Sequence, residues 1–271
     1  MGRSSRFLGV RELVRLTGVF VGVVVLAAGC SSSASTDRAG TYEGAGQQLG
    51  NGTIRTYVAV DSDGHPTEIG VRLTKAALDG LPAVDPAPDQ PLTIGLPLPS
   101  QAAGTDFDHV TVNWNAQGHA PTNLFGVPHF DFHFYMTDMA AQRAIDPTAV
   151  GYSEAASNVP APQYVPQDYL MVPDSAFPMM GVHWVDGTVP LDPSQFHFTQ
   201  ILLNGSWDGK YTFIEPMVTR AYLLSNPSLT QDLKQPQEFQ KTGYFPTRYS
   251  VQHDADFYTV ALTGMAHHDA A

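Results

Sequence analysis

The sequence predicts a mainly β protein, an antiparallel barrel or sandwich with two or three short helices. Many segments alternate apolar and polar residues or are rich in β-branched and aromatic side chains, which favours strands. The 24 glycines and 21 prolines are spread along the whole chain, which indicates short elements joined by many turns. Strands that follow one another through short turns pair antiparallel, and they close into a barrel or stack as a sandwich.

The expected strands form three hairpins and two further extended segments. Residues 53–61 and 68–74 flank an Asp-Gly turn, which is a strong hairpin signal. Residues 196–204 are expected to pair with 210–224 across the turn GSWDG, and 247–254 with 256–264. The segment 91–99 contains three prolines, which place it at a sheet edge, and 107–115 is a further strand.

Three short helices are expected between these strands. Residues 75–82 form a helix stopped by Gly80 and Pro82. A second helix covers 138–145, with Thr137 as its N-cap and Asp146-Pro147 as its end. The segment 226–234 is expected to be a short capped helix. The proline-rich segment 157–180 is expected to cross the fold with little regular structure.

The N-terminus has the three parts of a secretory signal peptide. Four arginines precede the short apolar run 16–26, which is followed by Ala-Ala-Gly and Cys30. This order resembles the lipobox of bacterial lipoproteins, which implies cleavage before Cys30 and acylation of its thiol. We therefore expect a signal peptide at 1–29, a flexible tether at 30–40 and a single β-rich domain at 41–271. The location expected is extracytoplasmic, attached to the bacterial cell membrane by the lipid.

The charge and the cysteine count narrow the possible functions. The chain has 14 basic and 26 acidic side chains. Removal of the first 29 residues takes away four arginines and one glutamate, so the mature chain has 10 basic and 25 acidic groups and a net charge of −15. Such a chain lacks the positive charge that binds nucleic acid. Cys30 is the only cysteine, so a lipidated chain has no disulfide, thiolate ligand or cysteine nucleophile.

The stretch PHFDFHFYMTD (128–138) carries the clearest chemical pattern. It places His129, Asp131 and His133 on one side of an expected strand and three phenylalanines on the other. Neighbours on one strand face lie about 6.6 Å apart and the outer pair about 13 Å. Asp131 can therefore share a metal ion with either histidine, whereas His129 and His133 cannot share one without a bulge.

Two ligand sets are compatible with this pattern. His129 and Asp131 with His183 would form a two-histidine, one-carboxylate iron site. The alternative combines His129 or His133 with His183 and with Glu215, a carboxylate at the end of an apolar strand, in a zinc or manganese site. His119 is expected to be a proton carrier or to support a ligand. The cofactor would be a divalent Zn, Mn or Fe ion.

Four motifs together resemble an uncharacterised family of exported bacterial proteins and lipoproteins. They are WNAQGHAP (114–121), PHFDFHFYMTD (128–138), FPMMGVHWVD (177–186) and GSWDGKYTFIEPM (205–217). The resemblance implies an extracytoplasmic, β-rich and homo-oligomeric domain. It supplies no known reaction.

The sequence thus favours an envelope-anchored metal-binding lipoprotein and leaves open whether it is an enzyme. The alternative is a non-enzymatic lipoprotein that binds a small molecule or has a structural role. In that case the histidines form a buried polar cluster with Asp131 and with backbone groups.

Overall fold

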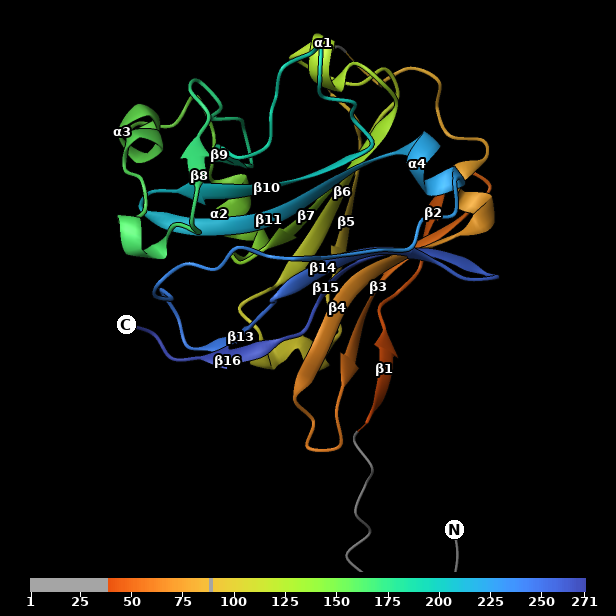
Figure 1. Ribbon diagram of the computed structural model, residues 1–271, viewed down its shortest axis with the longest axis horizontal. Coiled ribbons are helices and arrows are strands. Elements are labelled where there is room, and N and C mark those ends of the chain that lie inside the picture. The colour runs from red at the N-terminus through yellow and green to blue at the C-terminus, as the bar shows by residue number, and fades with distance from the viewer. Residues whose placement is uncertain (1–38, 88–89) are drawn as a thin grey trace, which may run out of the picture. The chain divides into compact units, whose positions relative to one another are not determined.

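Two antiparallel sheets lie face to face in the computed structural model, which describes residues 39–87 and 90–271 (Figure 1). The first sheet has the order β1-β3-β4-β15-β14-β12, and β2 also pairs with β3. Its strands are β1 (Gly40–Glu43), β2 (Gln47–Leu49), β3 (Gly52–Val60), β4 (Pro66–Thr74), β12 (Leu229–Asp232), β14 (Arg248–His253) and β15 (Phe257–Thr263). The fold is therefore the sandwich of the two expected alternatives.

The second sheet has the order β5-β6-β7-β11-β10-β9-β8. Its strands are β5 (Leu92–Pro97), β6 (His109–Asn115), β7 (His129–Tyr135), β8 (Tyr169–Met171), β9 (Val182–Asp186), β10 (Gln200–Trp207) and β11 (Lys210–Thr219). A separate pair is formed by β13 (Gly243–Phe245) and β16 (Ala266–His268). As expected from its prolines, β5 lies at a sheet edge.

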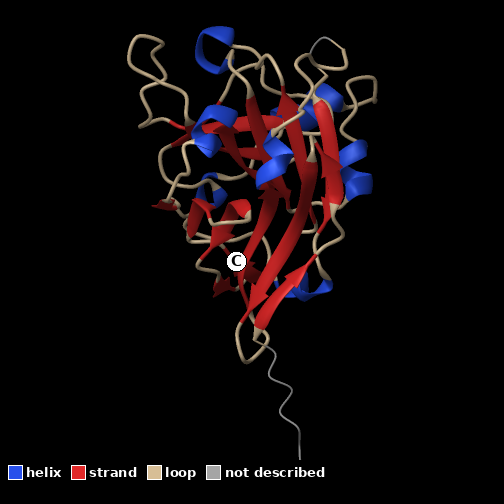
Figure 2. Ribbon diagram, turned by 90° about the vertical axis from the view of Figure 1, so that its right-hand side faces the viewer, coloured by secondary structure: helices blue, strands red, loops and turns tan. Residues whose placement is uncertain are grey.

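The helices are short and lie outside the two sheets (Figure 2). The α-helices are α1 (Thr122–Phe125), α2 (Met139–Arg143), α3 (Tyr152–Ser157) and α4 (Arg220–Leu224). Short 3-10 helices cover Lys75–Leu78, Ser100–Gly104 and Pro162–Tyr164. Among the described residues, no helix is long and apolar enough to span a membrane.

Several local expectations were wrong. The strand expected over 196–204 covers 200–207 and includes the first three residues of the expected turn GSWDG. The helix expected over 75–82 is the short 3-10 helix Lys75–Leu78. The segment 226–234 contains strand β12 instead of a helix, because its residues pair with β14 at the edge of the first sheet. The cap of α2 is Asp138 and not Thr137, since the Asp138 carboxylate accepts from the backbone N–H groups of Ala140 and Ala141. The strand expected over 210–224 ends at Thr219, whose hydroxyl caps α4 by accepting from Tyr222 N–H.

The hydrophobic core lies between the two sheets. Ile69, Val71 and Leu73 of β4 face it from the first sheet, and Phe130, Phe132 and Phe134 of β7 from the second. All six side chains are fully buried, so burial of this apolar surface is the main stabilising term. The alternation of β7 therefore holds as expected, and His129, Asp131 and His133 lie on the outer face of the second sheet.

This outer face is also buried, because loops and α2 cover it. Tyr135 donates to the carbonyl of Met179, and Phe198 contacts the ring of His129. Gln142 of α2 contacts Nε2 of His109 on β6. The chemistry of the motif therefore sits between a sheet and its covering loops, not in the lumen of a barrel. The expected signal peptide, the expected lipidation site Cys30 and all but the last two residues of the expected tether lie outside the described residues.

Candidate metal centres

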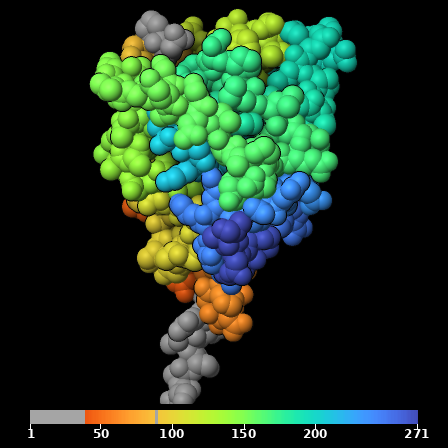
Figure 3. Space-filling view, turned by 90° about the vertical axis from the view of Figure 1, so that its left-hand side faces the viewer, coloured from red at the N-terminus to blue at the C-terminus, as the bar shows by residue number. Residues whose placement is uncertain are grey.

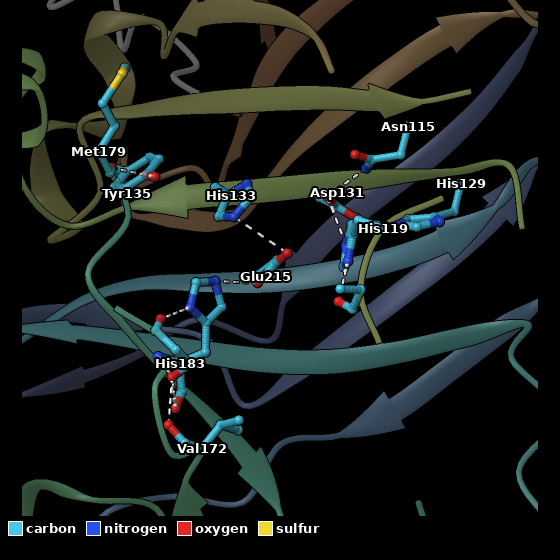
Figure 4. Close-up of polar contacts among 12 residues, drawn as sticks. Asn115, His119, His129, Asp131, His133, Tyr135, Val172, Met179, His183 and Glu215 are labelled. Carbon is cyan, nitrogen blue, oxygen red and sulfur yellow. Dashed lines mark hydrogen bonds and ion pairs between the residues drawn. The ribbon is translucent and has the colours of Figure 1, made fainter. Parts of the chain in front are cut away.

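The outer face of the second sheet brings five of the expected residues and His119 into one row (Figure 4). The register that pairs Phe213 with Tyr135 and Met217 with Asp131 places Glu215 opposite His133. His119 reaches the row from the loop between β6 and β7, and His183 from β9. The row divides into two groups of three residues. Within each group, the nitrogen and oxygen atoms that could bind a metal lie within 4.8 Å of one another.

The first group contains His119, His129 and Asp131 and is called the Asp131 group below. Nε2 of His129 lies 3.2 Å from Oδ1 of Asp131, and Nε2 of His119 lies 3.7 Å from Oδ2. The side-chain amide of Asn115 donates to Oδ2 at 2.7 Å. The carboxylate is thus held by an amide and approached by two imidazoles.

The second group contains His133, His183 and Glu215 and is called the Glu215 group below. Nε2 of His133 lies 3.3 Å from Oε1 of Glu215, and Nε2 of His183 lies 3.7 Å from Oε2. Each group therefore offers two imidazoles and one carboxylate, a donor set found in zinc and non-haem iron sites.

These separations fit a shared metal ion better than a direct hydrogen bond. Two atoms bound to one zinc ion at about 2.0–2.1 Å in tetrahedral geometry lie about 3.4 Å apart. A charge-assisted N–H···O bond would bring the same atoms to about 2.7–2.9 Å. The four observed nitrogen–oxygen distances run from 3.2 to 3.7 Å, in the range set by a shared ion.

Backbone contacts fix the orientation of three of the four histidines. Nδ1 of His129 lies 2.6 Å from the carbonyl of Val127, and Nδ1 of His119 lies 2.9 Å from the carbonyl of Ala120. Nδ1 of His183 lies 2.9 Å from the carbonyl of Ser175. A carbonyl only accepts, so Nδ1 carries the hydrogen in each ring and a neutral imidazole presents the lone pair of Nε2.

That lone pair points at a carboxylate oxygen, which is also an acceptor. Among the described residues, Nε2 of His129, Nε2 of His133, Oδ1 of Asp131 and Oε2 of Glu215 are buried without a hydrogen-bond partner. Leaving a buried polar atom unpaired costs about 1–3 kcal/mol. A cation between the facing acceptors, either a proton or a metal ion, removes this cost.

The two carboxyl groups differ in their ionisation. Burial opposes ionisation of Asp131, but the contacts with His119 and His129 outweigh it and lower its pKa. Burial raises the pKa of Glu215 well above its usual value, and the negative charge of Asp131 raises it further. The surroundings therefore favour the ionised form of Asp131 and oppose the ionised form of Glu215.

The pKa values of the histidines also differ between the two groups. Burial lowers the pKa of His133 to about 3, although the charge of Asp131 opposes this shift, and burial also lowers the pKa of His183. Burial acts in the same direction on His119, but there the contact with Asp131 prevails and raises the pKa. The Glu215 group thus presents neutral imidazoles, the form that binds metal.

A glycine allows His183 to reach Glu215 across β10. Gly205 lies opposite His183 on one side and Phe213 on the other. A Cβ atom built on Gly205 would lie 2.0 Å from the Phe213 ring, so the ring occupies the place of a side chain. The ring of Phe213 in turn contacts His133 and His183. Gly205 and Phe213 therefore shape the floor of the Glu215 group.

The structure shows which of the side chains named in the two alternative ligand sets lie close together. It brings His133, His183 and Glu215 together and places His129 with Asp131, but it does not bring His183 to the Asp131 group. His119, expected in a supporting role, lies as close to Asp131 as His183 lies to Glu215. Asn115 was not singled out from the sequence, and its only sequence signal is its place on the same strand face as the row.

Other polar clusters lie apart from this row. Asp61, Asp63 and His65 are close together in the β3–β4 turn, but they lie in or near solvent and Asp61 already accepts from two backbone N–H groups. A pocket of about 720 Å³ lies at one end of the sandwich (Figure 3). Its lining includes Tyr169, Asn204, Tyr211, Ile214, Lys234 and Lys241, and none of the six residues of the row.

A comparison with known families gives one partial similarity. A family model described as TTHB210-like, hypothetical protein TTHB210, matches residues 61–114. The match covers 54 of the 271 residues and ends at Trp114, where the first of the four motifs begins. It is consistent with a resemblance to an uncharacterised family and does not include the row. No curated protein and no solved structure matches the chain significantly.

Proposed function

We propose that this protein is an envelope lipoprotein that binds two divalent metal ions, one in the Asp131 group and one in the Glu215 group. The observation that carries the proposal is that, in each group, two imidazoles direct Nε2 at one buried carboxyl group. Imidazoles whose Nδ1–H groups bind carbonyls direct Nε2 at buried carboxylate oxygens from 3.2 to 3.7 Å away. A metal ion satisfies both sides at these distances.

The geometry favours two separate ions over a bridged pair. A bridged two-metal site holds its ions about 3.5–4 Å apart, whereas here the two sets of ligand-type residues are separate and have no member in common. Each carboxylate also directs both of its oxygens at histidines of its own group. Imidazole and carboxylate ligands suit zinc, iron and manganese.

The anchor and the location come from the sequence. The arginines, the apolar run and Cys30 support export and lipid attachment, and the acidic mature chain supports a cation-binding role. In this proposal the domain binds metal outside the cytoplasmic membrane, to which Cys30 attaches it. We assign no reaction to it.

The test is the metal content of the protein, purified without a histidine tag and measured by elemental mass spectrometry. We expect about two ions per chain, one in Asp131→Asn, one in Glu215→Gln and none in the double variant. His109→Gln is the matched control, because His109 is buried on the same sheet face but belongs to neither group. A wild-type chain that stays free of metal after incubation with zinc, manganese and anaerobic iron contradicts the proposal.

A further inference from the structure

The two groups differ in their access to solvent. In the Asp131 group the side chain of His119 is 34% exposed. In the Glu215 group the side chains of His133, His183 and Glu215 are 1%, 10% and 3% exposed. An ion in the Asp131 group therefore has a ligand at the surface, whereas an ion in the Glu215 group is enclosed by sheet and loops.

The groups also differ in how much of the fold an ion would connect. His133, His183 and Glu215 come from β7, β9 and β11, and they lie 50 and 32 positions apart in the chain. An ion there closes two long loops and ties three strands together. The members of the Asp131 group lie within 13 consecutive residues, on one loop and the strand that follows it. An ion in the Asp131 group would therefore cross-link only a short segment of the chain.

The covering loop strengthens the enclosure of the Glu215 group. The hydroxyl of Ser175 donates to the carbonyl of Val172 and accepts from the backbone N–H of His183, while the Ser175 carbonyl binds Nδ1 of the same histidine. The ring of Phe177 packs on His183 from outside. Release of an ion from this group therefore requires local opening of the loop.

We propose that the two ions have different roles: the Glu215 group holds a structural ion, and the Asp131 group holds an exchangeable ion that takes a small anion as its fourth ligand. This inference rests on the proposed function. Three protein ligands leave one position of a tetrahedral ion free. A divalent ion with one carboxylate retains a net positive charge, which favours an anionic ligand at the solvent side, near His119.

The experiment uses the full chain loaded with Co²⁺, whose visible spectrum reports its ligands, and EDTA as competitor. We expect one ion to leave rapidly and the second at least about 100-fold more slowly, because only the second requires local opening. Azide should shift the spectrum of the rapidly released ion alone. His119→Ala should remove the rapid phase and the azide response, and Glu215→Gln should remove the slow phase.

Two results overturn the inference while the proposed function stands. One is release of both ions at the same rate. The other is an azide response that persists in His119→Ala after the rapid phase is gone. A chain that binds no Co²⁺ overturns the inference and the proposed function together. Thermal unfolding adds a second measurement. Loss of the slowly released ion should lower the unfolding midpoint more than loss of the rapidly released ion.

Discussion

Replacing Gly205 with alanine should damage the Glu215 group and leave the Asp131 group intact. The added Cβ would lie 2.0, 2.3 and 2.4 Å from three atoms of the Phe213 ring. Atoms in van der Waals contact lie about 3.5–4.0 Å apart, so the ring must move by more than 1 Å. Phe213 is fully buried and packs against His133, His183 and Tyr135, so its movement displaces two of the expected ligands.

Overpacking of this kind costs about 1–3 kcal/mol, and the full burial of Phe213 among three aromatic rings favours the upper end. For a domain of this size each kcal/mol lowers the unfolding midpoint by about 2–4 °C, so a 3 kcal/mol loss lowers it by about 6–12 °C. We also expect the metal content to fall by one ion per chain. Calorimetry and elemental mass spectrometry measure the two effects.

Gly95→Ala is the matched control, because it lies in β5 of the same sheet. Its Cβ would meet only Met139, at an ordinary 3.7 Å. In a strand conformation that alanine adopts freely, this change is expected to be neutral or to stabilise by up to about 1 kcal/mol. The reasoning is refuted if Gly205→Ala keeps both ions and unfolds within about 2 °C of Gly95→Ala.

Three further results are expected. Asn115→Ala should weaken metal binding by the Asp131 group by about tenfold or more, because the Asn115 amide holds Oδ2 of Asp131. Competition with a chromophoric chelator measures this affinity. An unchanged affinity would count against the role of the amide. Burial raises the pKa of Glu215, so metal binding to the Glu215 group should release a proton from this residue. The metal affinity of the group should therefore rise with pH up to the raised pKa. Calorimetry in buffers of different ionisation enthalpy should detect this proton release in the wild type and not in Glu215→Gln. Cys30→Ser should move the protein from the membrane to the soluble fraction, and a variant that stays with the membrane contradicts lipid anchoring.

The sequence predicts the strands best where hydrophobic alternation and turn residues agree. The β3–β4, β10–β11 and β14–β15 hairpins are confirmed for this reason. The prediction failed at β12, where Asn226 and Pro227 have the composition of a helix start. Pairing with β14 supplies the segment with backbone hydrogen bonds that local preference cannot anticipate.

The candidate site was predictable in content but not in grouping. Alternation on β7 places Asp131 and His133 on one face, and the spacing argument separates His129 from His133, which lie in different groups of the structure. The position of Glu215 opposite His133 depends on the register between β7 and β11, whose first residues are 81 positions apart in the chain. Register between distant strands is set by the tertiary fold, and no local pattern encodes it.

The side chains that cover the row were the least predictable part. His119 reaches Asp131 from a loop, and the carbonyls that fix Nδ1 of three histidines belong to loop residues Val127, Ala120 and Ser175. Every residue has a backbone carbonyl, so the sequence does not indicate which carbonyls contact the histidines. The inference that Nε2 faces a cation therefore depends on the three-dimensional arrangement.

Anomalous diffraction from crystals of the metal-loaded protein tests the central claim most directly. Data collected on both sides of the absorption edge of the bound metal should show two peaks per chain. One peak should lie between His119, His129 and Asp131, and the other between His133, His183 and Glu215. No peak in either group, or strong peaks only elsewhere on the chain, would contradict the account and leave the row as a buried set of proton-bridged ion pairs.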